Sequence, residues 1–287
     1  MSFRTMFKQM STKKKIIGVL SGIFFILVIW TAWGNTALEL NPCTIRSDKL
    51  PGAFDGYRIA HISDLHNAEF GEGNQRLLDM LREAEPDVIA MTGDLIDSRR
   101  TNLAVALTFA EEAAQIAPCY YVSGNHEARV LEYQDLKAGL EAAGVTVLDD
   151  AYVKIDITVM GVNDPSFSAD YLTGDAAVID QKLSALTAEA SGFTILLSHR
   201  PELFNTYVRH DMDLVLSGHA HGGQFRLPLI GGLIAPNQGL FPRYDAGLYS
   251  ERDTNMIVSR GLGNSIIPFR FNNRPEVVLI ELKNQNR

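Results

Sequence analysis

Short apolar runs that each end in polar residues recur along the chain, and this pattern constrains the fold more than any other feature. Five runs have the length and composition of buried strands, at 57–63, 88–91, 119–122, 193–198 and 213–217. Amphipathic helical patterns at 74–85 and 103–117 separate the first three of them. Strands that alternate with helices build a mainly parallel sheet, so the sequence predicts an α/β fold.

The remaining apolar segments extend this prediction to a chain with two sheets. Helices are expected at 133–143 and 176–188, an edge strand at 38–46, and closing strands at 255–258 and 277–282. The segments 145–148 and 155–162 are predicted to be neighbouring strands of a second sheet. No linker divides residues 38–287, so we expect one domain there.

The five strand-like runs each deliver polar residues to their carboxyl ends. In chain order these are Asp64 and His66, Asp94, Asn125 and His126, His199, and finally His219 and His221. A lone aspartate at a strand end is usually a helix cap, and a lone histidine is usually a hydrogen-bonded core residue. Because open α/β sheets carry their chemistry at the carboxyl ends of strands, coincidence at five ends predicts a single site.

The chemistry of these side chains indicates a metal centre. Carboxylate, imidazole and amide oxygen are ligands that suit Mn²⁺, Fe, Zn²⁺ or Co²⁺, and seven of them are enough for two ions. In the motif Gly218-His219-Ala220-His221, an extended backbone would point both imidazoles to the same side, and glycine permits close approach. Taken alone, this motif also fits a polar turn with two solvated imidazoles.

The order of the motifs resembles that of the calcineurin-like metallophosphoesterases. The family's motifs stand here as Asp-x-His at 64–66, Gly-Asp-x-x-Asp at 93–97, Gly-Asn-His-Glu at 124–127, the single His199, and Gly-His-x-His at 218–221. The resemblance covers residues from about 57 to 224. It implies a four-layer αββα sandwich with the metals at the strand carboxyl ends.

The resemblance also implies a role for each site residue. By this likeness Asp64, His66 and His221 bind one metal ion, Asn125, His199 and His219 bind the second, and Asp94 bridges the two. His126 is similar to the family's histidine that is not a ligand and that protonates the leaving oxygen or stabilises the transition state. The implied reaction is attack on phosphorus by a hydroxide formed from water between the two cations.

Other polar residues near the motifs are given supporting roles. Asp97 and Glu127 are expected to support or cap the site. Arg200 and Arg260 are candidates for stabilising the phosphoryl oxygens, or are ordinary surface arginines. His61 and His210 lie outside the motifs and are expected to be structural.

The amino terminus predicts a single transmembrane helix ahead of the domain. Residues 16–33 carry no charge, and as a helix they would span about 27 Å, close to the thickness of the hydrocarbon layer. Three lysines precede this stretch and two tryptophans close it. We therefore expect a basic cytoplasmic tail at 1–15, a cell-membrane anchor at 16–33, and an extracytoplasmic metallophosphoesterase domain at 38–287. The alternative is a signal peptide cleaved near Ala32-Trp33-Gly34.

The charge balance restricts the partners. The formal net charge is −8, and the five basic residues of 1–15 leave 21 basic against 34 acidic residues in the rest of the chain. Such a domain repels nucleic-acid backbones, whereas bound cations would still admit a small phosphorylated substrate. Two cysteines, Cys43 and Cys119, are too few for a disulfide framework, although one bridge is allowed. The sequence leaves the oligomeric state open.

The resemblance extends to the bacterial membrane-associated phosphodiesterase branch of the family. It implies a phosphodiester or pyrophosphate substrate that is nucleotide-linked, lipid-linked or part of the cell envelope, since some relatives hydrolyse UDP-2,3-diacylglucosamine. The alternatives are a phosphomonoesterase of the same fold and an inactive metal-binding interaction protein, which would not require His126. The apolar stretch 225–244 either packs in the core or lies exposed beside the site, where it would accept acyl chains.

Overall fold

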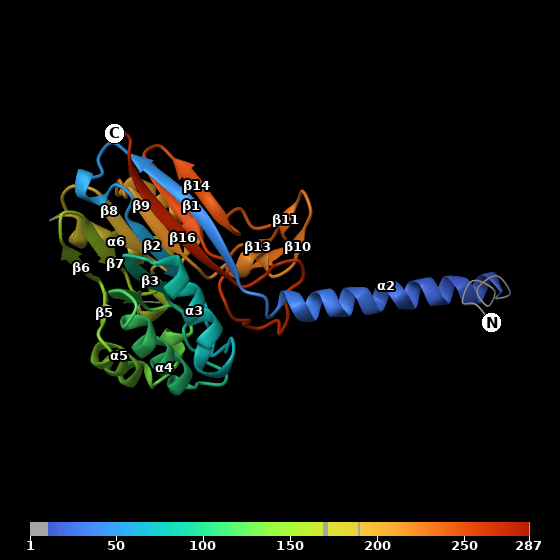
Figure 1. The fold of residues 1–287 in the computed structure, drawn as a ribbon. Helices are drawn as coiled ribbons and strands as arrows, with labels where there is room; N and C mark the ends of the chain where they lie inside the picture. The colour runs from blue at the N-terminus through green and yellow to red at the C-terminus, as the bar shows by residue number, and fades with distance from the viewer. Residues whose placement is uncertain (1–10, 169–171, 189, 287) are drawn as a thin grey trace.

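Two six-stranded sheets lie face to face in the computed structural model, which describes residues 11–168, 172–188 and 190–286 (Figure 1). The first sheet has the order β1 (Glu39–Ser47), β16 (Glu276–Asn284), β2 (Arg58–Ile62), β3 (Val88–Thr92), β4 (Cys119–Val122) and β5 (Val145–Val147). The second has the order β14 (Gly247–Glu251), β15 (Thr254–Val258), β9 (Leu214–Ser217), β8 (Thr194–Leu197), β7 (Thr158–Gly161) and β6 (Ala151–Lys154). Strands β2 to β5 of the first sheet run parallel to one another, and so do strands β7 to β9 of the second.

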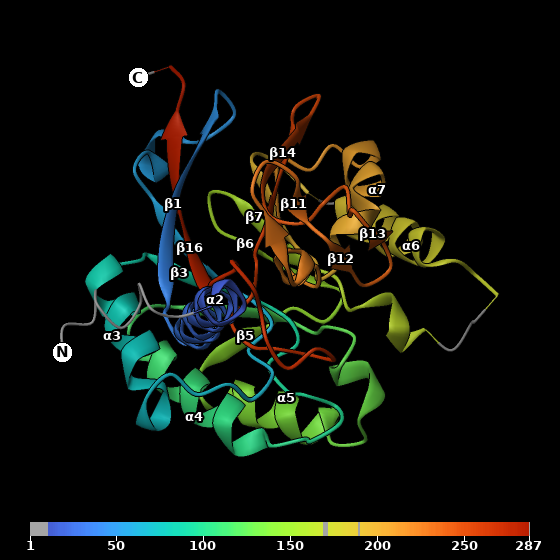
Figure 2. The ribbon, with the colours of Figure 1, turned by 90° about the vertical axis from the view of Figure 1, so that its right-hand side faces the viewer.

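Helices cover the outer face of each sheet, as Figure 2 shows from the side. The first sheet carries α3 (Gln75–Ala84), α4 (Leu103–Ala114) and α5 (Tyr133–Ala142), and the second carries α6 (Asp175–Thr187) and α7 (Phe204–Arg209). The layers therefore follow the order helices, sheet, sheet, helices. The predicted four-layer αββα sandwich is confirmed.

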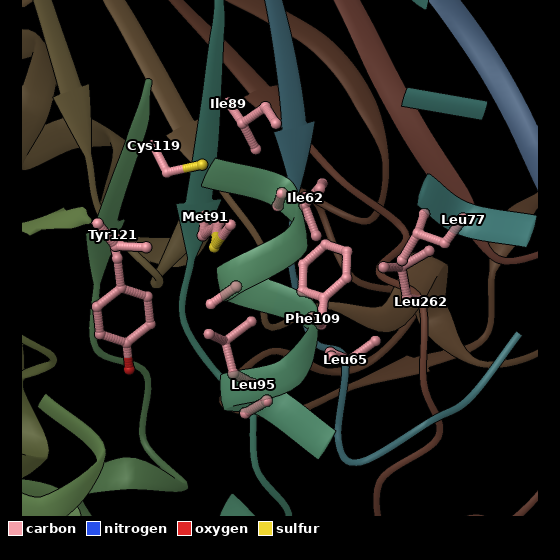
Figure 3. Packing of buried hydrophobic residues seen from close by; sticks show 14 of the residues in the cluster. Ile62, Leu65, Leu77, Ile89, Met91, Leu95, Phe109, Cys119, Tyr121 and Leu262 are labelled. Carbon is pink, nitrogen blue, oxygen red and sulfur yellow. The ribbon is translucent and has the colours of Figure 1, made fainter. Parts of the chain in front are cut away.

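Three apolar cores separate the four layers. On β3, Ile89 and Met91 belong to the core beneath α3 to α5, whereas Val88 and Ala90 belong to the core between the sheets. Figure 3 shows Phe109 of α4 in the first of these cores. Because the central strands are buried on both faces, their sequences read as continuous apolar runs. That is why the apolar runs of the sequence located these strands so well.

The expectation for residues 145–148 is wrong. They form β5, which pairs in parallel with β4 at the edge of the first sheet, because α5 returns the chain beside the strand that it left. The chain crosses to the second sheet only at β6, which the sequence reasoning missed, and β6 pairs antiparallel with β7. The expected edge strand near 38–46 is confirmed as β1, which pairs with β16 alone.

A single long helix, α2 (Thr12–Gly34), leaves the domain and makes no layer of the sandwich (Figure 1). Its apolar side chains are exposed along its length, and among the described helices it alone is long and apolar enough to cross a membrane. Ser11 caps its first turn by accepting a hydrogen bond from the amide of Lys14. Residues 1–10, the larger part of the predicted basic tail, lie outside the described residues.

The two cysteines are not bridged. Cys43 on β1 packs against the core between the sheets, and Cys119 on β4 is buried in the core beneath the helices. Both are free thiols, so the bridge that the sequence allowed does not form.

Candidate metal centre

The two sheets meet the same site from opposite sides. Asp64 and His66 follow β2, Asp94 follows β3, Asn125 and His126 follow β4, His199 follows β8, and His219 and His221 follow β9. Each of these eight residues is buried, and the structure brings the ligand atoms of seven of them into overlapping groups. The eighth, Asn125, directly precedes His126, whose amide donates to Asp94. The parallel strands explain this convergence, since their carboxyl ends lie at one edge of each sheet.

The backbone turns sharply at the site residues. Five of the eight have a positive φ: Asp64, His66, Asp94, His219 and His221. This region is uncommon for residues with a side chain and concentrates at functional sites. The expected extended conformation at His219 and His221 is therefore wrong, and their imidazoles enter different ligand groups. Only glycine fits at position 218, because a Cβ there would overlap Oγ of Ser63.

The first group consists of Asp64, His66 and His221, whose ligand atoms lie within 4.8 Å of one another. Nε2 of His221 lies 3.4 Å from Oδ1 of Asp64, and Nε2 of His66 lies 3.7 Å from the same oxygen. The two imidazole Nε2 atoms face each other at 3.2 Å. This arrangement presents one carboxylate oxygen and two ring nitrogens to a common point.

The second group consists of Asp94, His199 and His219. Nδ1 of His199 donates to the carbonyl of Thr92 at 2.7 Å, so Nε2 faces the site and would offer its lone pair to a bound cation. Nε2 of His219 faces the acceptor Oδ1 of Asn237 at 3.2 Å, so its Nδ1 lone pair also points inward. These two inward nitrogens lie 3.2 Å apart, an approach that two lone pairs tolerate when a cation lies between them.

Asp94 joins the two groups. Its Oδ2 lies 3.2 Å from Nε2 of His199 and 3.6 Å from Nε2 of His66. Its Oδ1 accepts the amide of His126 at 2.8 Å, which fixes the carboxylate in place. Oδ1 of Asn125 is buried and has no hydrogen-bond partner among the described residues, as expected of an oxygen reserved for a cation.

The charges of the site favour divalent cations. Burial alone would raise the pKa of Asp64 and of Asp94, but the surrounding histidines hold both below their ordinary values. Burial would lower the pKa of His199, but Asp94 and Asp64 raise it to about 10. The two buried carboxylates thus favour the protonated, positively charged form of the His199 imidazole. Bound cations would supply that positive charge instead. The donor set and its charge fit divalent metal ions.

The two histidines of the Gly-His-x-His motif are electrically different from His199. Burial lowers the pKa of His219 and of His221 to about 3. Both imidazoles are therefore neutral near pH 7 and keep the lone pair that a metal ligand needs.

His126 is held in one tautomer beside the ligands. The amide of Ser98 donates to its Nδ1 at 3.0 Å, so the proton of the neutral ring is on Nε2. Nε2 lies 4.0 Å from Oδ2 of Asp94 and 3.2 Å from Oγ of Ser265. Burial lowers the pKa of His126 to about 4, which keeps the ring neutral near pH 7.

Glu127 supports the ligand Asp94 from behind, and Asp97 supports His126. The Glu127 carboxylate is fully buried and accepts the amides of Asp94 and Gly124, both at 2.8 Å. Asp97 lies 3.5 Å from Nδ1 of His126 and pairs with Arg99 at 3.1 Å. The supporting roles expected for both residues agree with these contacts.

The two candidate arginines are engaged elsewhere. Arg200 is buried and forms an ion pair with Asp164 at 2.5 Å, so the surface interpretation is wrong for it. Arg260 pairs with Glu276 at 2.7 Å and with Glu39 at 2.8 Å. Both guanidinium groups are therefore committed to carboxylates.

Sequence reasoning missed Arg270, which is 1% exposed and lies beside the ligands. Its Nη2 lies 3.5 Å from Nδ1 of His221, and its Nη1 donates to the carbonyl of Arg260 at 2.6 Å. Burial lowers its pKa to about 10, which leaves it cationic near pH 7. The available signal was a single arginine after the uncharged segment 261–269.

The two histidines outside the motifs also lie outside the ligand groups. His61 is buried, and its Nε2 lies 2.8 Å from Oγ1 of Thr92. His210 pairs with Asp180 at 3.1 Å. Their contacts are structural, as predicted.

Comparison with known proteins defines the class. The family model described as calcineurin-like phosphoesterase matches residues 57–223, more than half of the chain. The chain belongs to this family and is a metal-dependent phosphoester hydrolase. In fold it is similar to the TT1561 protein of Thermus thermophilus, with a TM-score of 0.52 and 16% identity over 72% of this chain and 90% of that one.

Among curated relatives, similarity extends over most of the chain. It is 31% identical to the uncharacterized metallophosphoesterase YkuE of Bacillus subtilis over 87% of each protein. It is 30% identical to the phosphodiesterase YaeI of Escherichia coli over 79% of this chain and 82% of that protein. A Danio rerio transmembrane protein with a metallophosphoesterase domain is 31% identical over 82% of this chain and 55% of its own length.

Asp94→Asn should lower the metal content of the chain, because Asp94 faces both candidate ligand groups. Asparagine keeps an oxygen for the amide of His126 but removes the charge that faces both ligand groups, so we expect the content to fall from about two ions per chain to less than one. Elemental analysis of the purified chain measures this. The control is Asp97→Asn, a buried carboxylate outside the ligand groups, which should keep its metal. Full metal content in Asp94→Asn would disprove the bridging role.

Proposed function

We propose that this chain is a membrane-anchored phosphodiesterase with two divalent transition-metal ions. The observation that carries the proposal is the pair of ligand groups that Asp94 joins, with the Asn125 oxygen free of other partners among the described residues. Asp64, His66 and His221 would hold one ion, and Asn125, His199 and His219 the other, with Asp94 shared. Mn, Fe, Zn and Co all suit this mixture of oxygen and nitrogen ligands.

The residues of the chain divide the remaining work. When bound, the metal ions supply Lewis-acid chemistry that polarises phosphoryl oxygens and acidifies water. His126 presents Nε2–H beside Asp94, where it can donate to the leaving oxygen or to a phosphoryl oxygen. Glu127 fixes the backbone of Asp94 and Gly124, and the amide of His126 holds the Asp94 carboxylate itself.

The substrate class is a phosphodiester or pyrophosphate that is lipid-linked, nucleotide-linked or part of the cell envelope. A diester rather than a monoester is supported by the relative YaeI, which is named a phosphodiesterase. The strongly acidic domain favours a small substrate over a nucleic-acid backbone.

A hydrolysis panel tests this function. The full chain, supplied with Mn²⁺, Zn²⁺, Co²⁺ or Fe²⁺, should cleave aryl phosphodiesters and nucleotide-linked lipids faster than aryl phosphomonoesters. The measurement is kcat/KM for each substrate, with Asp94→Asn as the control for contaminating enzymes. A preference for monoesters would move the chain to the phosphomonoesterase alternative. Metal binding without any turnover would favour the inactive interaction protein.

His126→Ala should separate metal binding from catalysis. We expect near-normal metal content and a fall in kcat of roughly 10²- to 10⁴-fold, the range for a lost general acid or base. The fall should shrink as the leaving group improves, because a good leaving group needs no proton. His210→Ala, whose ring pairs with Asp180 outside the ligand groups, is the control and should keep full activity. Equal losses across a leaving-group series would exclude proton donation.

The anchor and its orientation are part of the proposal. Exposure of α2 along its length and the likeness to a named transmembrane protein support a membrane-crossing role. The lysines at its start favour a cytoplasmic amino terminus, and the domain from residue 38 onward would lie on the other side of the cell membrane.

Protease added to spheroplasts should therefore digest the domain and spare an epitope tag at the amino terminus. Immunoblotting for the tag and for a carboxyl-terminal epitope reports both sides of the membrane. Permeabilised spheroplasts are the control, in which both epitopes should disappear. Survival of the domain in sealed spheroplasts would show the opposite orientation. If the domain is already free of the tag before any protease is added, the apolar segment is a cleaved signal peptide.

A further inference from the structure

The segment after the metal-binding histidines exposes large apolar side chains. Residues 226–240 form two small hairpins, β10 (Arg226–Leu227) with β11 (Gly231–Gly232) and β12 (Ile234–Ala235) with β13 (Gly239–Leu240). Residues 227–242 carry no charge. Ala235 and Tyr244 pack in the core of the second sheet, so the core interpretation of 225–244 holds for them. Leu229, Ile230, Leu240 and Phe241 are all exposed.

A second uncharged loop, 261–269, continues this surface. Ile266 and Phe269 are exposed, and the ring of Phe269 lies 5.4 Å from that of Phe225, which connects the loop to the hairpins. Leu227 and Ile234 are exposed to a smaller extent, and we call the six most exposed residues of the two segments the apolar rim: Leu229, Ile230, Leu240, Phe241, Ile266 and Phe269. The two segments that carry the rim, 227–242 and 261–269, contain no acidic residue, although the domain as a whole is strongly acidic.

The loop of the rim is bonded to the end of α2. Oδ1 of Asn35, directly after the helix, accepts the amide of Arg270 at 2.8 Å, and Nδ2 of Asn35 donates to the carbonyl of Arg270 at 2.9 Å. Asn264 also donates to Asn35 at 3.2 Å. Figure 1 shows the hairpins on the side of the domain from which α2 leaves, and Figure 2, with α2 seen nearly end-on, shows them on the same face.

The segments that carry the rim also touch the metal centre. Asn237, in the turn between β12 and β13, lies 3.2 Å from Nε2 of His219. Ser265, next to Ile266, lies 3.2 Å from Nε2 of His126. The exposed apolar side chains are therefore held at the border of the site by residues that contact it.

We propose that the apolar rim inserts into the interfacial layer of the bilayer that α2 crosses, so that the metal centre opens at the membrane surface and takes its phosphodiester from a lipid headgroup. The inference rests on the proposed function and its anchor. A bilayer is favoured over a second copy of the chain because α2 places a membrane on this face. Trp30 and Trp33 lie in the last turns of α2, just before Asn35, and tryptophan is enriched at the membrane–water interface. Uncharged loops with large apolar tips are suited to that layer.

A fluorescence experiment tests the insertion without reference to activity. Single cysteines replace Leu229, Leu240 or Ile266 in the full chain carrying Cys43→Ser, and each is labelled with an environment-sensitive dye. The chains are reconstituted into phosphatidylcholine–phosphatidylglycerol vesicles whose acyl chains carry bromine. Leu131→Cys is the matched control, since Leu131 is 99% exposed and lies outside both rim segments. We expect blue-shifted, bromine-quenched emission at the three rim positions and neither effect at 131.

The absence of quenching at the rim overturns the proposal. If copies of the chain instead crosslink through the cysteine introduced at position 229, the rim is a surface for self-association. Both results are independent of turnover, so they leave the proposed function standing. Conversely, quenching in a chain that hydrolyses nothing supports the insertion while the proposed function fails.

A kinetic experiment tests the consequence for the substrate. The double variant Leu229→Ser with Leu240→Ser should raise KM for a lipid-borne phosphodiester in vesicles by at least about tenfold, the change expected when a leucine-sized contact is lost. KM for a soluble aryl phosphodiester should stay within about twofold, since neither residue touches the ligand groups. Leu131→Ser is the control and should change neither value. An equal rise for both substrates would contradict access from the membrane.

Discussion

The negative charge of two buried carboxylates is the constraint on which the rest of this structure depends. Asp64 and Asp94 lie at the junction of the two sheets, out of contact with water, and each is surrounded by imidazoles rather than by lysine or arginine ion pairs. Such charges are costly to bury without a cation. The positive φ values at five site residues and the close approach at Gly218 are local costs that the metal centre would offset.

The loop from Gly261 to Arg270 connects three parts of the molecule that lie far apart in the sequence. The amides of Leu262 and Gly263 donate to the carbonyls of Ser63 and Asp64, Ser265 lies beside His126, and Arg270 lies beside His221. At its far end the loop is bonded to Asn35 at the end of α2. The end of α2 is therefore held relative to the metal centre by hydrogen bonds rather than by a flexible tether.

The cores explain why the site is rigid. The central strands are packed on both faces, so a shift of one strand would disturb two apolar layers at once. Ligands at the ends of such strands are held to positions that loops alone would not define. The proposed membrane contact would add orientation to a site whose internal geometry the sandwich already sets.

The sequence by itself determined the central strands, the helices α3 to α6 and the eight residues at the strand ends, because buried parallel strands have a continuous apolar pattern and their ends fall at one edge of a sheet. It placed β5 in the wrong sheet and missed β6 altogether, because both strands are short and partly exposed and their apolar pattern is weak. Arg270 also escaped it, since nothing local distinguishes a buried arginine from a surface one. Only the tertiary structure decided that Arg270, Ser265 and Asn237 border the metal centre and that α2 ends beside Arg270. These are contacts between segments far apart in the sequence, and their spacing along the chain does not reveal that they are close in space.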